Sequence, residues 1–226
     1  MTSYVLKVIA LISMFCDHSG YIFLGSISYL NIIGRIAFPI FAFQISEGYK
    51  HTKNIQKYIL RLFVFSFISQ IPFTLFLKSI GNTGFSLNVF FTLLLGLISI
   101  VIYDNIKNKY NNKFLGFIPV ILLSIIAHFL KCDYGWYGVI LIFTFYLFKA
   151  NKFLMNTGVI CLMSIKYLID FVKTPSIYYL YFYFGAIFSL IFINLYNNKK
   201  GKNIKYLLYI FYPLHLIILA LIKIYS

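Results

Sequence analysis

The sequence predicts an all-α fold: a polytopic transmembrane helical bundle of about nine helices, with residues 1–226 forming a single integral membrane domain. Hydrophobic residues make up 61% of the chain and charged residues only 11%. A soluble domain carries about 25% charged residues, so this chain cannot cover itself in water. Its apolar runs approach the ~20 residues that one helical crossing needs, without the alternation of a membrane β-barrel.

Nine apolar segments follow one another, each bounded by polar turn residues. The first two are separated only by a short Gly-Ser turn, and the third ends before the turn GNTG at 81–84. Asn111 and Asn112 separate the fourth from the fifth, and no linker divides the chain. The sixth segment is short and is expected to tilt or to extend at its ends. The predicted segments are 4–24, 27–47, 58–78, 86–103, 114–130, 135–149, 153–171, 177–196 and 204–224.

Basic residues occupy alternate loops, and the net charge is +15. The positive-inside rule then predicts a cell-membrane protein whose N-terminus is cytoplasmic and whose C-terminus is outside. Anionic membrane lipid accounts for this charge better than nucleic acid, so no nucleic-acid partner is expected. The basic loops contain Lys50, Lys53, Lys57 and Arg61, then Lys107, Lys109 and Lys113, then Lys149 and Lys152, then Lys199, Lys200, Lys202 and Lys205.

Asp17 and His18 are neighbours inside the first apolar segment, at a depth similar to that of Arg35 in the second. A carboxylate in hydrocarbon costs roughly 2.5–3.5 kcal/mol, so a buried ionisable pair indicates function first. Asp17 either orients His18, which then acts as a base, or serves another residue, because adjacent helical residues point about 100° apart. Arg35 is either the counter-ion of Asp17 or a clamp for an oxyanion. The structural alternative is an ion bridge between two helices.

His215 lies in the last segment, three residues after Tyr212 and two after Pro213. It is a second candidate base, and its structural alternative is a hydrogen bond between helices. The four histidines are scattered and the three cysteines lack paired spacing, so no metal site is expected.

A basic row follows the cytoplasmic end of the second segment, at spacings that place its members on one helical face. Such a row suits a polyphosphate ligand, although on charge alone anchoring to anionic lipid is the better explanation. Four outer or boundary residues are candidates for substrate contact: Glu47, Asn88, Asp133 and Trp136. For Trp136 the alternative is the interfacial aromatic belt. The candidate cofactor-binding residues are Lys50, His51, Lys53, Lys57 and Arg61.

The sequence resembles the TraX family of multi-pass proteins, named for a conjugative pilin acetylase. The resembling stretches run in order over nearly the whole chain: LKVIALISMFCDHSGYIF, IIGRIAFPIFAFQISEGYKHTKNIQKYILRLFVFSFISQIPF, LNVFFTLLLGL, DYGWYGVILIF and YPLHL.

The resemblance implies an acyltransferase, acetyl-CoA-dependent, acting on an acceptor amine or hydroxyl near the outer face. Asp17 and His18 would be its reactive pair, and the basic cytoplasmic residues would hold the CoA phosphates. His18 would act as general base or carry the acyl group, while Arg35 or Asn88 stabilises the oxyanion. A peptide, a glycan and a small molecule remain open as acceptors. The competing functions are a small-solute or proton-coupled transporter, which the absence of an inverted repeat disfavours, and an accessory membrane subunit.

Overall fold

The computed structural model describes residues 1–25 and 28–225, and every regular element in these residues is an α-helix. The predicted all-α fold is confirmed. The expected start of the second segment at residue 27 lies outside the described residues, and so does the side chain of Lys205.

Eleven helices in the described part of the chain correspond to the nine predicted segments, because two segments each contain two helices. Residues 35–36 separate the first such pair, and Ser69 separates the second. The helices are α1 (Ser3–Phe23), α2 (Tyr29–Gly34), α3 (Ala37–His51), α4 (Ile55–Ile68), α5 (Gln70–Ser79), α6 (Val89–Tyr110), α7 (Lys113–Phe129), α8 (Gly135–Leu147), α9 (Lys152–Lys173), α10 (Tyr178–Asn194) and α11 (Lys205–Tyr225).

Two prolines explain both breaks. A proline lacks an N–H and its ring clashes with the carbonyl four residues earlier. Pro39 therefore interrupts the helix at Arg35, where α2 gives way to α3, and Pro72 interrupts it at Ile68, the last residue of α4.

Six of the helical spans are long and apolar enough to cross a membrane, which is the pattern of a multi-pass membrane protein. The helices α7, α8 and α10 are shorter. The shortest of these three helices is α8 with 13 residues, and it corresponds to the sixth segment, which was predicted to be short. The six long spans are Ser3–Phe23, Tyr29–His51, Ile55–Ser79, Val89–Tyr110, Lys152–Lys173 and Tyr206–Tyr225.

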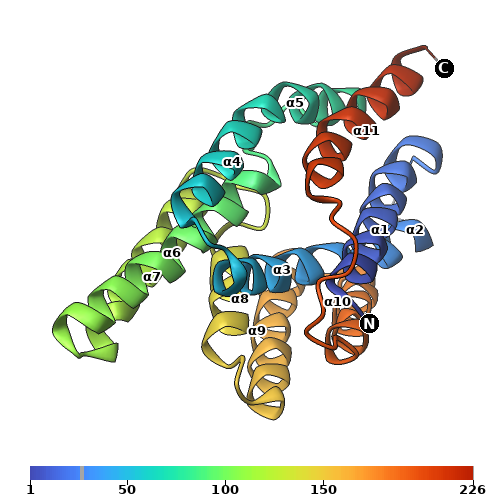
Figure 1. Ribbon diagram of the computed structural model, residues 1–226. Helices are drawn as coiled ribbons and strands as arrows, with labels where there is room; N and C mark the ends of the chain where they lie inside the picture. Colours follow the sequence, from blue (N-terminus) through green and yellow to red (C-terminus); the bar gives the residue numbers. More distant parts are fainter. Residues whose placement is uncertain (26–27, 226) are drawn as a thin grey trace.

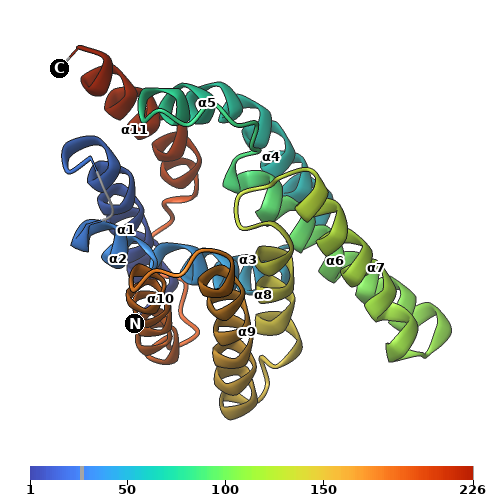
Figure 2. The ribbon, with the colours of Figure 1, turned by 180° about the vertical axis from the view of Figure 1, so that it is seen from behind.

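The helix α3 lies near the centre of the bundle (Figures 1 and 2). On one side of it are α1 and α10, and on the other are α4, α6 and α7. Although α11 is last in the sequence, it packs along both α5 and α1. This arrangement brings the C-terminal helix against the first one.

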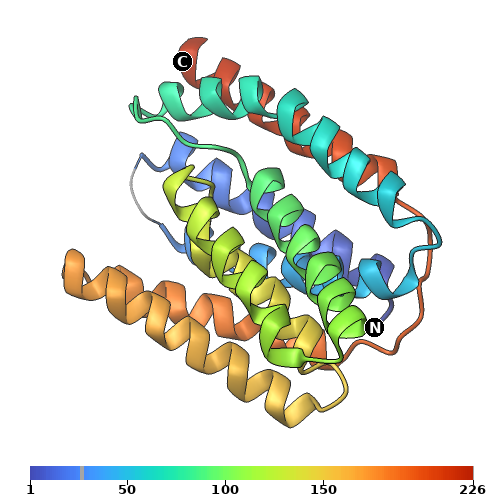
Figure 3. The same cartoon turned by 90° about the vertical axis from the view of Figure 1, so that its left-hand side faces the viewer.

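The predicted basic loops gather at one end of the bundle, which we call the basic end (Figure 3). The loops are those at 52–54, 111–112, 148–151 and 195–204. The last of these is fixed to the N-terminal segment by two main-chain hydrogen bonds, from Ser3 N to Lys199 O at 2.8 Å and from Tyr4 N to Lys200 O at 3.0 Å. The N-terminal and C-terminal parts of the chain lie at opposite ends of the bundle (Figure 3).

At the other end, the loops at 80–88 and 130–134 pair with each other. Leu87 N donates to Lys131 O at 3.0 Å, and Asp133 N donates to Leu87 O at 2.7 Å. This pairing fixes the start of α6 beside the start of α8. Toward the basic end, the Asp104 carboxylate of α6 accepts hydrogen bonds from the hydroxyls of Tyr49 in α3 and Tyr146 in α8.

Candidate active site

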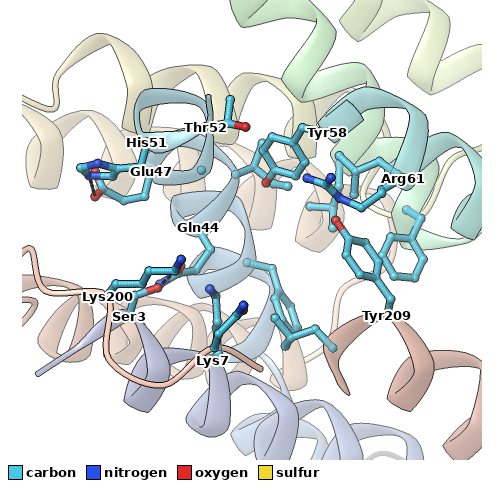
Figure 4. Close-up of a pocket in the computed structure, with 18 of the residues that line it drawn as sticks. Ser3, Lys7, Gln44, Glu47, His51, Thr52, Tyr58, Arg61, Lys200 and Tyr209 are labelled. Atoms are coloured by element: carbon cyan, nitrogen blue, oxygen red, sulfur yellow. Dashed lines mark hydrogen bonds and ion pairs between the residues drawn. The ribbon is translucent and has the colours of Figure 1, made fainter. Parts of the chain in front are cut away.

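A cavity of about 580 Å³ opens at the basic end, between α1, α3, α4, α6, α11 and the 195–204 loop (Figure 4). Cofactor and small-molecule sites typically enclose ~300–1,000 Å³, so this cavity can hold a ligand of that class. Its polar lining residues are Ser3, Lys7, Gln44, Glu47, His51, Thr52, Lys53, Tyr58, Arg61, Tyr196, Asn198, Lys200, Asn203, Tyr209 and Tyr212.

Four cationic side chains line this cavity: Lys7, Lys53, Arg61 and Lys200. None of the four makes an ion pair with a carboxylate of the described residues. Lys7 and Arg61 are only partly exposed to solvent. A partly buried cation without a counter-ion is costly, so the cavity wall favours an anionic ligand.

Glu47 is the one carboxylate among the described residues of the cavity wall, and it is already neutralised. It is buried, and its two oxygens lie 2.5 Å from Lys149 Nζ and 3.4 Å from His51 Nε2. Burial lowers the pKa of Lys149, and the Glu47 carboxylate opposes that shift. Burial, followed by Glu47, raises the pKa of Tyr196 to about 12. The Glu47 carboxylate therefore interacts with Lys149 and His51, and it does not neutralise the four cations of the cavity wall.

The inner end of the cavity is apolar and aromatic. Met14 of α1, Phe90 of α6 and Tyr212 of α11 line it. Tyr212 packs edge-on against Phe90, with ring centroids 5.3 Å apart, and its ring lies 6.4 Å from that of His18. His18 does not itself line the cavity. The cavity thus ends beside His18, one helical turn before it along α1.

His18 and His215 form a hydrogen-bonded pair between α1 and α11. His18 Nδ1 lies 2.7 Å from His215 Nε2, and His215 Nδ1 lies 2.7 Å from the backbone oxygen of Phe211. The carbonyl only accepts, so His215 Nδ1 must carry a proton and its Nε2 must accept from His18 Nδ1–H when both rings are neutral. This order leaves His18 Nε2 unprotonated and able to act as a base.

Asp17 serves Arg35 and does not orient His18, which is the second of the two alternatives that the sequence left open. Its carboxylate Oδ1 lies 2.6 Å from Arg35 Nη2 and accepts from Asn31 Nδ2 at 3.2 Å. The guanidinium of Arg35 also lies 4.6 Å from the ring centroid of Phe182 in α10. The two residues leave α1 on different faces, because successive helical residues point about 100° apart. Asp17 and Arg35 therefore form the ion bridge that was the structural alternative.

Asn88, Asp133 and Trp136 do not line the cavity. The Asn88 side chain caps α6 by accepting from Phe90 N at 3.0 Å, and its amide donates to Ser66 O at 2.7 Å. Since these groups are already paired, Asn88 offers no donor for an oxyanion. Asp133 lies in the 130–134 loop, where burial raises its pKa to about 6. Trp136 packs edge-on against its neighbour Tyr137 at the start of α8.

The basic row does not lie on one helical face. The helix α3 ends at His51, and Asn54 caps a new helix by accepting from Lys57 N at 2.8 Å. Of the five predicted cofactor-binding residues, His51, Lys53 and Arg61 line the cavity. Lys50 and Lys57 are exposed and do not line it.

The cavity residues that were not predicted from the sequence as ligand contacts include Lys7, Gln44 and Lys200. Lys7 is a cation inside an apolar segment, which was a usable signal. Lys200 belongs to a loop whose charge membrane anchoring already explained. Gln44 had no local signal, because only the packing of α3 against α1 brings it to the cavity.

The comparisons with known proteins agree with one another. The chain matches the model of the TraX family, described as TraX protein, over residues 3–223. It is 32% identical to the "Probable fimbrial assembly protein FimC, serogroup H1" of Dichelobacter nodosus, over 99% of this chain and 96% of that protein. It is 28% identical to the uncharacterized protein RP591 of Rickettsia prowazekii, over 71% of this chain and 60% of that protein. No solved structure matches.

Proposed function

Because this chain belongs to the TraX family, we propose that it is a membrane acyltransferase. It would move an acetyl group from acetyl-CoA to an amine or hydroxyl of an acceptor. The observation that carries this proposal is one cavity with a cationic wall at the basic end and a histidine pair just beyond its inner end.

The length of the cavity suits a CoA thioester. Lys7 and His18 are eleven residues apart in α1, which at 1.5 Å per residue is about 16 Å. The pantetheine arm is an extended flexible chain of comparable length. Phosphates held near Lys7 would therefore put the thioester close to His18. The polar-to-apolar gradient of the wall supports the same orientation.

His18 would be the general base. Its Nε2 takes the proton from the acceptor nitrogen or oxygen as that atom bonds to the thioester carbonyl carbon. The carbon–sulfur bond then breaks, and His18 returns the proton to the leaving thiolate. His215 holds His18 in the tautomer that leaves Nε2 free, because its own Nδ1 is committed to Phe211 O.

The burial of the two histidines supports this division of roles. His215 is only 4% exposed, whereas His18 is partly exposed. A general base that contacts the acceptor must be accessible to it, whereas a residue that only positions this base can be fully buried.

The name of the FimC relative, a fimbrial assembly protein, favours a protein acceptor. Loop charge favours a cytoplasmic basic end, so that the donor enters from the cytosol and the acceptor from the other side.

The test is transfer of label from acetyl-CoA by the protein in native membranes, with binding measured on purified protein in detergent. His18→Asn retains a donor at the position of Nδ1 but removes the base, so transfer should fall by about 10²-fold or more. His128→Asn, an exposed histidine on α7, is the matched control and should transfer at the wild-type rate. Wild-type protein that binds no acetyl-CoA, or full transfer by His18→Asn, would contradict the proposal.

A further inference from the structure

Three of the four unpaired cations of the cavity, Lys7, Lys200 and Arg61, form two separate groups (Figure 4). Lys7 and Lys200 lie on one side, with Ser3 and Gln44. Arg61 lies on the other side, next to Tyr58 and Tyr209. Each group has features that indicate a ligand of its own.

The first group presents donors without acceptors. The Ser3 hydroxyl donates to Gln44 Oε1 at 2.8 Å, which leaves the amide nitrogen of Gln44 as the free end of that side chain. This nitrogen is buried and has no hydrogen-bond partner among the described residues. Buried donors are almost always paired, so this nitrogen is placed to donate to an oxygen of a ligand in the cavity. With Lys7 and Lys200 beside it, this side of the cavity suits a doubly charged anion.

The second group is built around Arg61. Its guanidinium carbon lies 5.6 Å from the ring centroid of Tyr58, and Figure 4 shows it directed toward the space between Tyr58 and Tyr209. Its Nε is buried without a partner among the described residues. A guanidinium offers paired donors that match two oxygens of one phosphate. This side of the cavity therefore suits a terminal phosphate group.

We propose that Arg61 recognises the 3′-phosphate of the CoA ribose, while Lys7 and Lys200 hold the diphosphate of the same ligand. This inference rests on the proposed function, which already takes acetyl-CoA as the donor, and adds the residues that bind each phosphate group. The separation of the two cationic groups supports it, because the diphosphate and the 3′-phosphate are attached to different positions of the CoA ribose.

The experiment compares the dissociation constants of CoA and dephospho-CoA, which lacks the 3′-phosphate, for purified full-length protein in detergent. Wild-type protein should prefer CoA by about tenfold or more, as expected for a charge-assisted contact. Arg61→Gln should lose that preference while binding dephospho-CoA as well as the wild type does. Lys7→Gln should weaken both ligands by a similar factor and keep the preference. Lys113→Gln, an exposed cation outside the cavity, is the matched control.

Equal binding of the two ligands by wild-type protein would overturn this inference and leave the proposed function standing. A preference that survives Arg61→Gln would also overturn it. Failure of wild-type protein to bind either ligand would instead refute the proposed function. If Arg61→Gln does not fold, Arg61→Lys gives the same test, because its single ammonium group keeps the charge without the paired donors and should reduce the preference.

Discussion

Asp17→Asn should lower the stability of the protein without changing acyl transfer, and His18→Asn should abolish most transfer with little effect on stability, although the two residues are neighbours in the sequence. Asp17 lies 2.6 Å from Arg35 Nη2, and the two side chains are only 13% and 17% exposed. Removing one partner of such a buried pair leaves a charge without a counter-ion, which costs about 3–5 kcal/mol. Because some solvent reaches both groups, we expect the lower part of this range, about 3 kcal/mol, for Asp17→Asn. The rate of acyl transfer per folded molecule should remain near the wild-type value.

For His18→Asn we expect a small change in stability and a large loss of acyl transfer. Its amide nitrogen can still donate to His215 Nε2, so the change in unfolding free energy should be about 1 kcal/mol or less. The base is lost, so transfer should fall by about 10²-fold or more. Both variants are compared in one detergent, with unfolding followed by circular dichroism and transfer followed with labelled acetyl-CoA.

The double variant Asp17→Asn/Arg35→Gln is the control for the ion pair. It removes both charges, so it should recover much of the stability that Asp17→Asn loses. An Asp17→Asn protein that stays folded but no longer transfers the acyl group would refute the reasoning. Asp17 would then act in the chemistry, and the division between the two faces of α1 would be wrong.

Three further predictions follow from the structure. Lys7→Gln should weaken acetyl-CoA binding by about tenfold, whereas Lys57→Gln should not change it, as calorimetry on purified protein can measure. Asp104→Ala removes the acceptor of two tyrosine hydroxyls and should lower the unfolding free energy by about 2–4 kcal/mol in a denaturant titration. For Asp133, burial raises the pKa from 3.8 to about 6, so the folded state binds its proton more tightly than the unfolded state. The contribution of Asp133 to thermal stability should therefore be greatest below pH ~4 and should be lost as the pH rises through ~6, so Asp133→Asn should be more stable than the wild type above pH ~6, by a margin that disappears below pH ~4.

The sequence was sufficient to predict the helices because a membrane span needs a long apolar run and polar turns on both sides. The breaks at Arg35 and at Ile68 were not predicted, although Pro39 and Pro72 each stand four residues after them. The rule that proline disrupts the carbonyl four residues earlier accounts for both. The apolar pattern of these two segments does not show that each of them contains two helices.

The residue types of the site could be predicted from the sequence, but the interaction partners of those residues could be predicted only in part. His18, Arg35 and His215 stood out because ionisable groups are costly inside a bilayer. Their pairing depends on how α1, α2 and α11 are rotated, which a pattern of apolar residues does not specify. The two side chains that were expected to act together, Asp17 and His18, therefore have separate partners. Gln44 reaches the cavity only through tertiary packing, so no local pattern marks it.

The rotation of α1 about its own axis determines the partners of both Asp17 and His18. One face of the helix carries Lys7 and Met14 along the cavity and then His18 just beyond its end, while Asp17 holds α2 from the other face. The ion pair of Asp17 with Arg35 thus holds α1 against α2, on a face about 100° from the one that carries His18. His18 itself is held by His215, which accepts from its Nδ1 and leaves its other nitrogen available. A rotation of α1 by one residue, about 100°, would move the Asp17 carboxylate into the direction that His18 now takes, beside the proposed thioester. The Asp17–Arg35 pair therefore stabilises the bundle in this arrangement, whereas acyl transfer depends on His18 and its partner His215.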